Sequence, residues 1–266
     1  MVRCDGQIVC IPGLPHGEKE CVFVFSLPHL SMILLTALLV PLCCKWARTW
    51  QKQTVDRFFK VMAVAVLFFD PTYWMWELLT RGRIDLAGSL PLYVCSLFWL
   101  LLPLAVYSRE GVVRRCAQSC LCTACLLGGV MGMIFNSHVG RHPFFTFVPL
   151  YSMFYHFMLI LVISLLWVTR YYRPKPVDRW LCMLPVVALV LVDVVLNRRY
   201  GWDYCFTAGG PGTPLALVSS RVPQMVFLLL LYGGMALLIG WGFYSWFFRR
   251  QEAGQEQNAV AVAEDG

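Results

Sequence analysis

The chain has 266 residues, of which 59% are apolar and 14% are charged, and its formal net charge is +7. A soluble globular domain carries about 25% charged and about 45–50% apolar residues, so this composition excludes that class. The apolar residues form long runs separated by short charged segments, which is typical of helices that cross a lipid bilayer.

Taken in chain order, each apolar run is near the ~20 residues that a helix needs to cross the hydrocarbon core. The runs at 90–107 and 180–196 are short and contain proline, which is tolerated where neighbouring helices cover the break. We therefore predict an all-α fold, a polytopic transmembrane helical bundle of about seven spans. The predicted spans are 22–44, 58–79, 90–107, 116–135, 147–169, 180–196 and 223–247.

The segments that flank the spans predict an orientation. If the N-terminus is placed outside, most of the 22 lysines and arginines fall on the inner side, which the positive-inside rule favours. We therefore predict N-out and C-in. Residues 1–21 are then an extracytoplasmic N-terminal segment, 22–247 a membrane domain, and 248–266 a polar, acidic and disordered cytoplasmic tail.

The positive charge also bears on partners. Inner flanks that face anionic lipid account for it, so membrane lipid is the expected partner and no nucleic acid is expected. The sequence identifies no protein partner.

Polar side chains inside an apolar span are candidate functional groups, because lipid makes them costly to bury. Under the predicted orientation, most of them share the outer half of the bundle. Cys95 and His156 lie roughly 8 and 14 Å below the outer boundary at ~1.5 Å per residue, so they can meet if their spans are neighbours. We predict a polar pocket open to the outer leaflet, near Glu77, Cys95, Asn136, His138, His156, Asp193, Asn197 and Asp203.

Several of these polar residues also have a structural interpretation. His156 can hydrogen-bond a neighbouring helix, and Cys95 can serve as a small apolar side chain. Glu77 can pair with Arg81 as an i,i+4 ion pair. Asp70, in the second span, can cap the proline-broken turn that follows it. The shared depth of the polar residues favours a site more than any one of them does.

Cysteines are frequent, with 12 in the chain. Those in the range 116–125 are close in sequence but do not share one face of a helix, whereas the ligands of a metal ion must converge. We predict no metal site, and no motif for a cofactor is present. Gly128 and Gly132 form a G-x-x-x-G pattern, which is more typical of a close helix contact than of chemistry.

Three stretches of the chain resemble one known family, in the right order. Glu77–Pro103 reads ELLTRGRIDLAGSLPLYVCSLFWLLLP, Phe154–Leu161 reads FYHFMLIL, and Asn197–Leu215 reads NRRYGWDYCFTAGGPGTPL. They resemble the YwaF-like integral membrane family of bacteria, which is similar to eukaryotic transmembrane protein 164. The resemblance covers residues 58–247. Tyr93 stands where the family usually has His, and Asp203 where it usually has Asn.

The resemblance implies a lipid acyltransferase or hydrolase in the bacterial inner (cytoplasmic) membrane, acting without a cofactor. Carried over by position, Cys95 is the nucleophile and His156 its base. The chemistry is consistent, because an adjacent imidazole can generate the reactive thiolate, and an acyl-enzyme splits acyl transfer into two easier steps. The residues predicted to bind the substrate are Glu77, Asn136, His138, Asn197 and Asp203.

Two alternative functions would use the same pocket. A transporter for a small polar solute predicts polar residues that continue to the inner side, where the spans offer little besides Asp70. A non-catalytic membrane binding or assembly protein predicts that substitutions in the pocket are tolerated. We favour the acyltransferase or hydrolase.

Overall fold

The computed structural model describes residues 26–136, 138–139, 142–210, 213 and 215–251. The predicted N-terminal segment, 1–21, and nearly all of the predicted tail, 248–266, lie outside these residues. Within the described residues the secondary structure is helical and contains no strand. This confirms the predicted all-α class.

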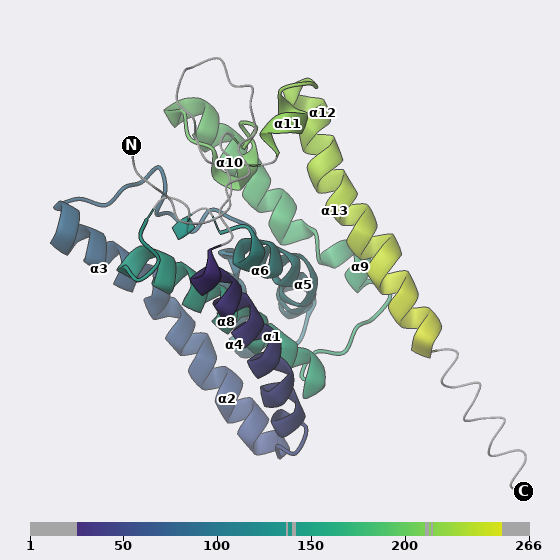
Figure 1. Ribbon diagram of the computed structural model, residues 1–266. Helices are drawn as coiled ribbons and strands as arrows, with labels where there is room; N and C mark the ends of the chain where they lie inside the picture. Colours follow the sequence, from purple (N-terminus) through teal and green to yellow (C-terminus); the bar gives the residue numbers. More distant parts are fainter. Residues whose placement is uncertain (1–25, 137, 140–141, 211–212, 214, 252–266) are drawn as a thin grey trace, which may run out of the picture.

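Among the described residues, six helices are long and apolar enough to cross a membrane, and one further apolar helix is shorter. The chain is therefore the predicted polytopic helical bundle (Figure 1). Which end of the bundle faces outward stays a prediction.

The elements follow one another along the chain, and several of the spans join consecutive helices. The six spans are α1 (Leu27–Ala47); α2 (Lys52–Ala65), η1 (Val66–Phe68) and α3 (Phe69–Arg81); α5 (Val112–Cys120), η2 (Leu121–Cys125) and α6 (Leu126–Ile134); α8 (Phe147–Val168); α9 (Asp178–Leu181) and α10 (Leu184–Tyr200); and α12 (Gln224–Leu228), η4 (Leu229–Gly233), α13 (Gly234–Leu237) and η5 (Leu238–Phe243). The shorter elements are α4 (Leu97–Tyr107), η3 (Tyr204–Phe206) and α11 (Ala216–Ser219).

The predicted span 90–107 is helical only from Leu97 onward. The first part of this apolar run forms turns because its backbone groups are bound by distant side chains. Trp74 Nε1 donates to the Ser89 carbonyl at 2.8 Å, and the Leu90 N–H donates to the Tyr204 hydroxyl at 3.0 Å. Cys95 therefore lies in a turn at the N-terminal end of α4.

A proline explains the 3₁₀ turn η1 between α2 and α3. Pro71 has no N–H, so the carbonyl of Leu67, four residues earlier, loses its usual helical donor. The indole of Trp99, on α4, donates to that carbonyl at 3.3 Å. A side chain of the neighbouring helix α4 thus replaces the backbone donor that the second span lacks at this break.

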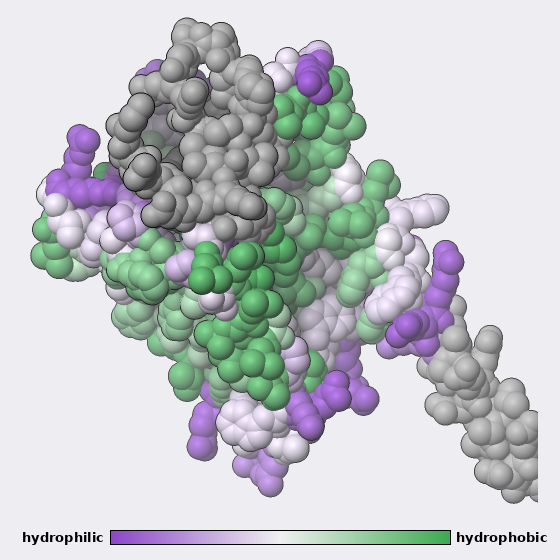
Figure 2. Space-filling model, in the orientation of Figure 1, coloured by the Kyte–Doolittle hydropathy of each residue, from purple (hydrophilic) through white to green (hydrophobic). Residues whose placement is uncertain are grey.

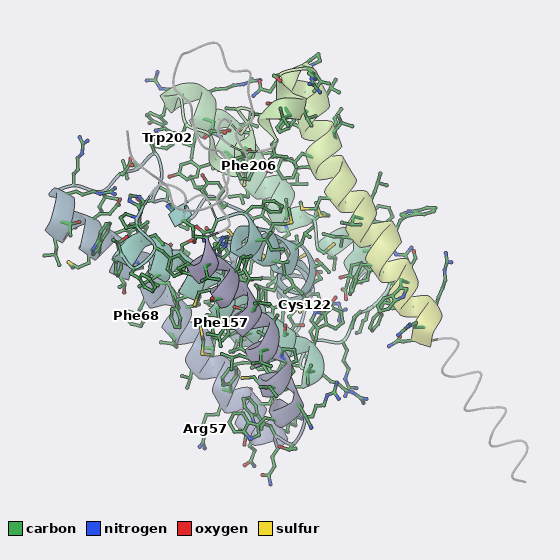
Figure 3. The ribbon with its side chains drawn as sticks, viewed as in Figure 1. Arg57, Phe68, Cys122, Phe157, Trp202 and Phe206 are labelled. Atoms are coloured by element: carbon green, nitrogen blue, oxygen red, sulfur yellow. The ribbon has the colours of Figure 1, made fainter. Side chains whose placement is uncertain are left out.

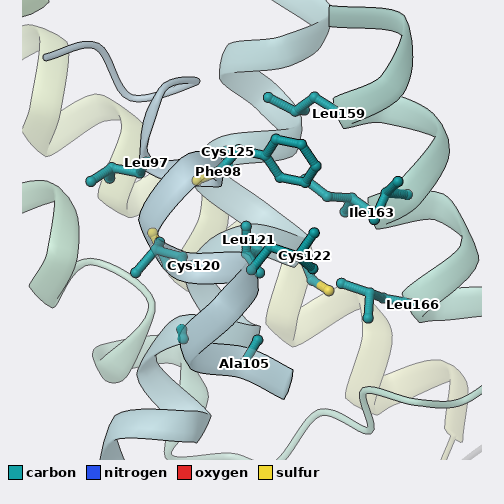
Figure 4. Packing of buried hydrophobic residues seen from close by; sticks show 14 of the residues in the cluster. Leu97, Phe98, Ala105, Cys120, Leu121, Cys122, Cys125, Leu159, Ile163 and Leu166 are labelled. Carbon is teal, nitrogen blue, oxygen red and sulfur yellow. The ribbon is translucent and has the colours of Figure 1, made fainter. Parts of the chain in front are cut away.

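The helix α5–η2–α6 forms the centre of the bundle. In its apolar window 61% of the residues are buried inside the protein, against 17% for α1. Leu121 and Cys122 on η2 pack with Phe98 of α4 and Ile163 of α8 (Figure 4). On the face shown in Figure 2, the coloured residues form a broad hydrophobic band with hydrophilic residues toward its ends, as expected for a surface that lipid solvates.

Candidate active site

Cys95 and His156 both contact one face of α6, which we call the glycine face and define by Gly128 and Gly132. A Cβ atom at Gly128 would lie 3.2 Å from the backbone N of Cys95, and one at Gly132 would lie 2.2 Å from Nε2 of His156. The two glycines are four residues apart, which places them about 6 Å apart along the axis of α6. The contact predicted from the G-x-x-x-G pattern is confirmed, and its partners are Cys95 and His156.

The protonation of the His156 ring follows from its hydrogen bond. Nδ1 lies 2.8 Å from the carbonyl oxygen of Ser152 in the same helix, α8. A carbonyl oxygen can only accept, so Nδ1 carries the hydrogen, and the neutral ring has its free lone pair on Nε2. Nε2 is the atom that faces Gly132. The free lone pair of the ring therefore lies on the side of α6.

Asn136 and His138 lie at the same end of α6 and are connected to His156 through Ser152. The Asn136 amide donates to the Ser152 hydroxyl at 2.9 Å, and its Oδ1 accepts from the His138 backbone N–H at 3.1 Å. Ser152 in turn holds Nδ1 of His156 through its carbonyl. These predicted site residues form one connected group.

The segment that carries Cys95 is a direct neighbour of α8, as the predicted pair requires. The Tyr155 hydroxyl donates to the carbonyl of Cys95 at 3.3 Å. Asp70 lies in the first turn of α3 and does not cap it, and its buried Oδ2 has no hydrogen-bond partner among the described residues. The structural interpretation of Asp70 as a helix cap is wrong.

Asn197 and Asp203 hold the loop 201–210. The Asn197 amide donates to the Tyr204 carbonyl at 2.8 Å and to the Thr207 hydroxyl at 2.6 Å, and its Oδ1 accepts from the Tyr204 N–H at 3.1 Å. Asp203 accepts the N–H groups of Ala208 and Gly210 at 2.7 and 2.8 Å. The pKa of Asp203 is raised by burial, against the opposing effect of these N–H donors.

The loop 201–210 packs against the segment that leads to Cys95. The Tyr204 hydroxyl donates to the Leu86 carbonyl at 2.6 Å, and the Cys205 thiol donates to the Leu92 carbonyl at 3.3 Å. Tyr93, which replaces the family-typical His, lies edge-on to Tyr204 with ring centroids 5.3 Å apart. Tyr93 thus belongs to the contact between loop and segment.

Glu77, on α3, binds the same segment that leads to Cys95. Its Oε1 pairs with Arg81 at 3.1 Å, and its Oε2 accepts the Asp85 N–H at 3.2 Å. The i,i+4 ion pair offered as the structural interpretation of Glu77 is confirmed, although the carboxylate is fully buried while Arg81 is partly exposed. The polar atoms of Glu77, Asn197 and Asp203 are engaged by the protein itself. Their predicted contact with substrate stays a prediction.

Three residues of this region were not singled out from the sequence: Ser152, Tyr155 and Tyr204. The hydroxyls of Tyr155 and Tyr204 donate to backbone carbonyls of distant elements, and Ser152 binds His156 through its own backbone carbonyl. No local motif reveals such contacts. Asp193, also predicted near the pocket, is fully buried on α10. In the described part of the chain, no group of three or more His, Cys, Asp or Glu residues is placed to hold a metal ion.

The fold and the site define a polytopic helical membrane protein with a buried polar region beside its central helix. The model of the TMEM164 family matches residues 24–244. The chain therefore belongs to the TMEM164 family, which agrees with the resemblance to transmembrane protein 164. Among the curated proteins and the solved structures, no match to this chain was found. The chain is thus an integral, multi-pass membrane protein. Its location in the bacterial inner membrane stays a prediction.

Proposed function

We propose that this protein is a lipid acyltransferase or hydrolase in which Cys95 is the nucleophile and His156 the base. The observation that carries the proposal is the glycine face of α6, which admits the backbone of Cys95 at one glycine and Nε2 of His156 at the next. The segment that carries Cys95 and the ring of His156 thus approach the same helix one turn apart, which supports the proposed pair.

The proposed reaction begins with a proton transfer. Nε2 of His156 takes the proton of the Cys95 thiol, and the thiolate attacks the ester carbonyl of a phospholipid. The ester C–O bond breaks, and the lysophospholipid leaves with the proton returned by His156. The acyl group, now a thioester on Cys95, passes to the hydroxyl of an acceptor lysolipid or to water, whose proton goes to His156. The thioester C–S bond breaks, and His156 returns this proton to the Cys95 thiolate, which restores the enzyme.

Cys95 lies at the N-terminal end of a helix. It immediately precedes Ser96, the N-cap of α4, which is followed by eleven helical residues. The N-terminal end of a helix carries a partial positive charge, and that charge stabilises a nearby anion.

The remaining predicted site residues have two roles in the proposal. Glu77, Asn197 and Asp203 are positioning residues, because they fix the segment 82–96 and the loop that packs on it. Asn136 holds the end of α6 to Ser152. His138, next to Asn136, is the residue we assign to the lipid head group.

The test is to trap the acyl-enzyme. The purified full chain is incubated with a phospholipid that has a labelled acyl chain, and peptides are analysed by mass spectrometry. We expect a labelled thioester on Cys95, its loss in Cys95→Ala, and lysolipid release at least about 10²-fold slower in His156→Gln. Cys43→Ala, on α1, is the matched control and should retain both signals. Full lysolipid release by Cys95→Ala would refute the proposal.

A further inference from the structure

An open groove runs along the exposed face of α2 and η1, with Tyr107 of α4 at its edge. Its volume is about 800 Å³, and it is lined by Gln53, Asp56, Arg57, Lys60, Val61, Val64, Ala65, Phe68 and Tyr107. Figure 3 shows Arg57 near one end of this stretch and Phe68 near the other. None of the residues of the glycine face lines this groove, so it is distinct from the candidate active site.

The groove is divided by polarity along its length. The end near Arg57 carries charged and amide side chains, and the end near Phe68 is apolar. Val61 and Phe68 are 60% and 64% exposed, so the protein itself does not fill this half. Phe68 follows Arg57 by eleven positions, which is a rise of about 16 Å along the helix. That is about half of the ~30 Å hydrocarbon core, the depth of one leaflet.

The charged end has an excess positive charge. Lys60 pairs with Asp56 at 2.7 Å, whereas Arg57 has no ion pair with any described residue. A guanidinium presents several donors in a planar fork that matches the oxygens of a phosphate. Gln53 adds an amide in the turn before Arg57.

The wall of the groove is held in place by a hydrogen bond from the neighbouring helix. The hydroxyl of Tyr107, on α4, donates to the backbone carbonyl of Lys60 at 2.9 Å. Because this hydrogen bond joins α2 to α4, the position of Tyr107 relative to the groove is fixed before a ligand binds.

We propose that this groove binds one anionic glycerophospholipid, with its phosphate at Arg57 and one acyl chain along Val61, Val64 and Phe68. A phospholipid fits both halves of the groove, because its charge and its chain lie one leaflet depth apart. Under the predicted orientation the head group lies at the inner surface, where anionic lipid is concentrated. This lipid is a bound structural component, separate from the substrate of the proposed reaction.

The test is native mass spectrometry of the purified full chain with equal amounts of phosphatidylglycerol and phosphatidylcholine that have identical acyl chains. We expect the wild type to retain phosphatidylglycerol preferentially. Arg57→Gln should lower that retention about fivefold, because the charge-assisted hydrogen bonds from the guanidinium to the phosphate are lost. Val64→Trp fills the apolar half and should reduce retention of both lipids.

Two matched controls distinguish the groove from the general lipid surface. Lys52→Gln removes a charge on the same helix outside the groove, and Leu35→Trp enlarges an exposed side chain on α1; both should behave as the wild type. Equal retention of the two lipids by the wild type would overturn the proposal. So would unchanged phosphatidylglycerol retention in both Arg57→Gln and Val64→Trp.

Discussion

The imidazole of His156 occupies a space that exists because position 132 has no side chain. A methyl group there would lie 2.2 Å from Nε2 and 2.5 Å from Cδ2, so Gly132→Ala must displace the ring. A misplacement of about 1 Å in a catalytic group can cost about 10²-fold in rate. We expect Gly132→Ala to lower acyl transfer by about that factor, measured as lysolipid release.

Gly129 provides the control for this prediction. A methyl group at Gly129 would lie 2.3 Å from Cδ2 of Leu159, so Gly129→Ala crowds the same helix against α8 but meets only an apolar side chain. Overpacking of this kind costs about 1–3 kcal/mol of stability, and both variants should show it as a lower Tm. Only Gly132→Ala should lose activity beyond its loss of folded protein. Equal losses in the two variants would mean that the position of His156 does not matter.

At the scale of elements, the loop 201–210 depends on one buried amide. Asn197 gives it three hydrogen bonds, two from Nδ2 and one to Oδ1, and each buried group left without a partner costs about 1–3 kcal/mol. We expect Asn197→Ala to speed hydrogen–deuterium exchange in the loop and in residues 86–92, which contact it. Arg198→Ala, the exposed next residue on α10, should leave exchange unchanged. Protection of 86–92 that survives in Asn197→Ala would contradict a role for the loop in holding them.

The elements themselves differ in how far the sequence predicts them. Hydropathy locates the long spans because lipid imposes one requirement, a run of apolar residues, on each of them. The same measure fails at 90–96, where the backbone is bound by Tyr204, 114 residues away from Leu90. In the candidate site, spacing predicts that Gly128 and Gly132 make a close contact, but it does not name the partner. Tyr155 and Cys95 are 60 residues apart, and their contact follows only from how the helices pack.

At the scale of the whole molecule, the C-terminal helix is fastened near both of its ends by polar contacts. Near its start, Gln224 donates to the Thr207 carbonyl at 2.7 Å, and Tyr232 donates to the Cys205 carbonyl at 2.6 Å. Near its other end, the hydroxyl of Tyr244 lies 2.9 Å from that of Tyr172. Only 17% of its apolar window is buried, so packing alone attaches this helix weakly, and it lies along the side of the bundle (Figure 1).

The contact with Tyr244 depends on Asp178, a fully buried carboxylate that accepts from both Arg115 and the hydroxyl of Tyr172. Removing one partner of a buried ion pair costs about 3–5 kcal/mol, because the other charge stays buried without compensation. Asp178→Asn should therefore lower the Tm strongly and release the C-terminal helix, measured as faster hydrogen–deuterium exchange over 224–251. The matched control is Asp56→Asn, which breaks the exposed pair with Lys60 and should cost no more than about 1 kcal/mol. If the two substitutions cost the same, the Asp178 cluster is not what joins this helix to the bundle, and the apolar contacts along its length must do so.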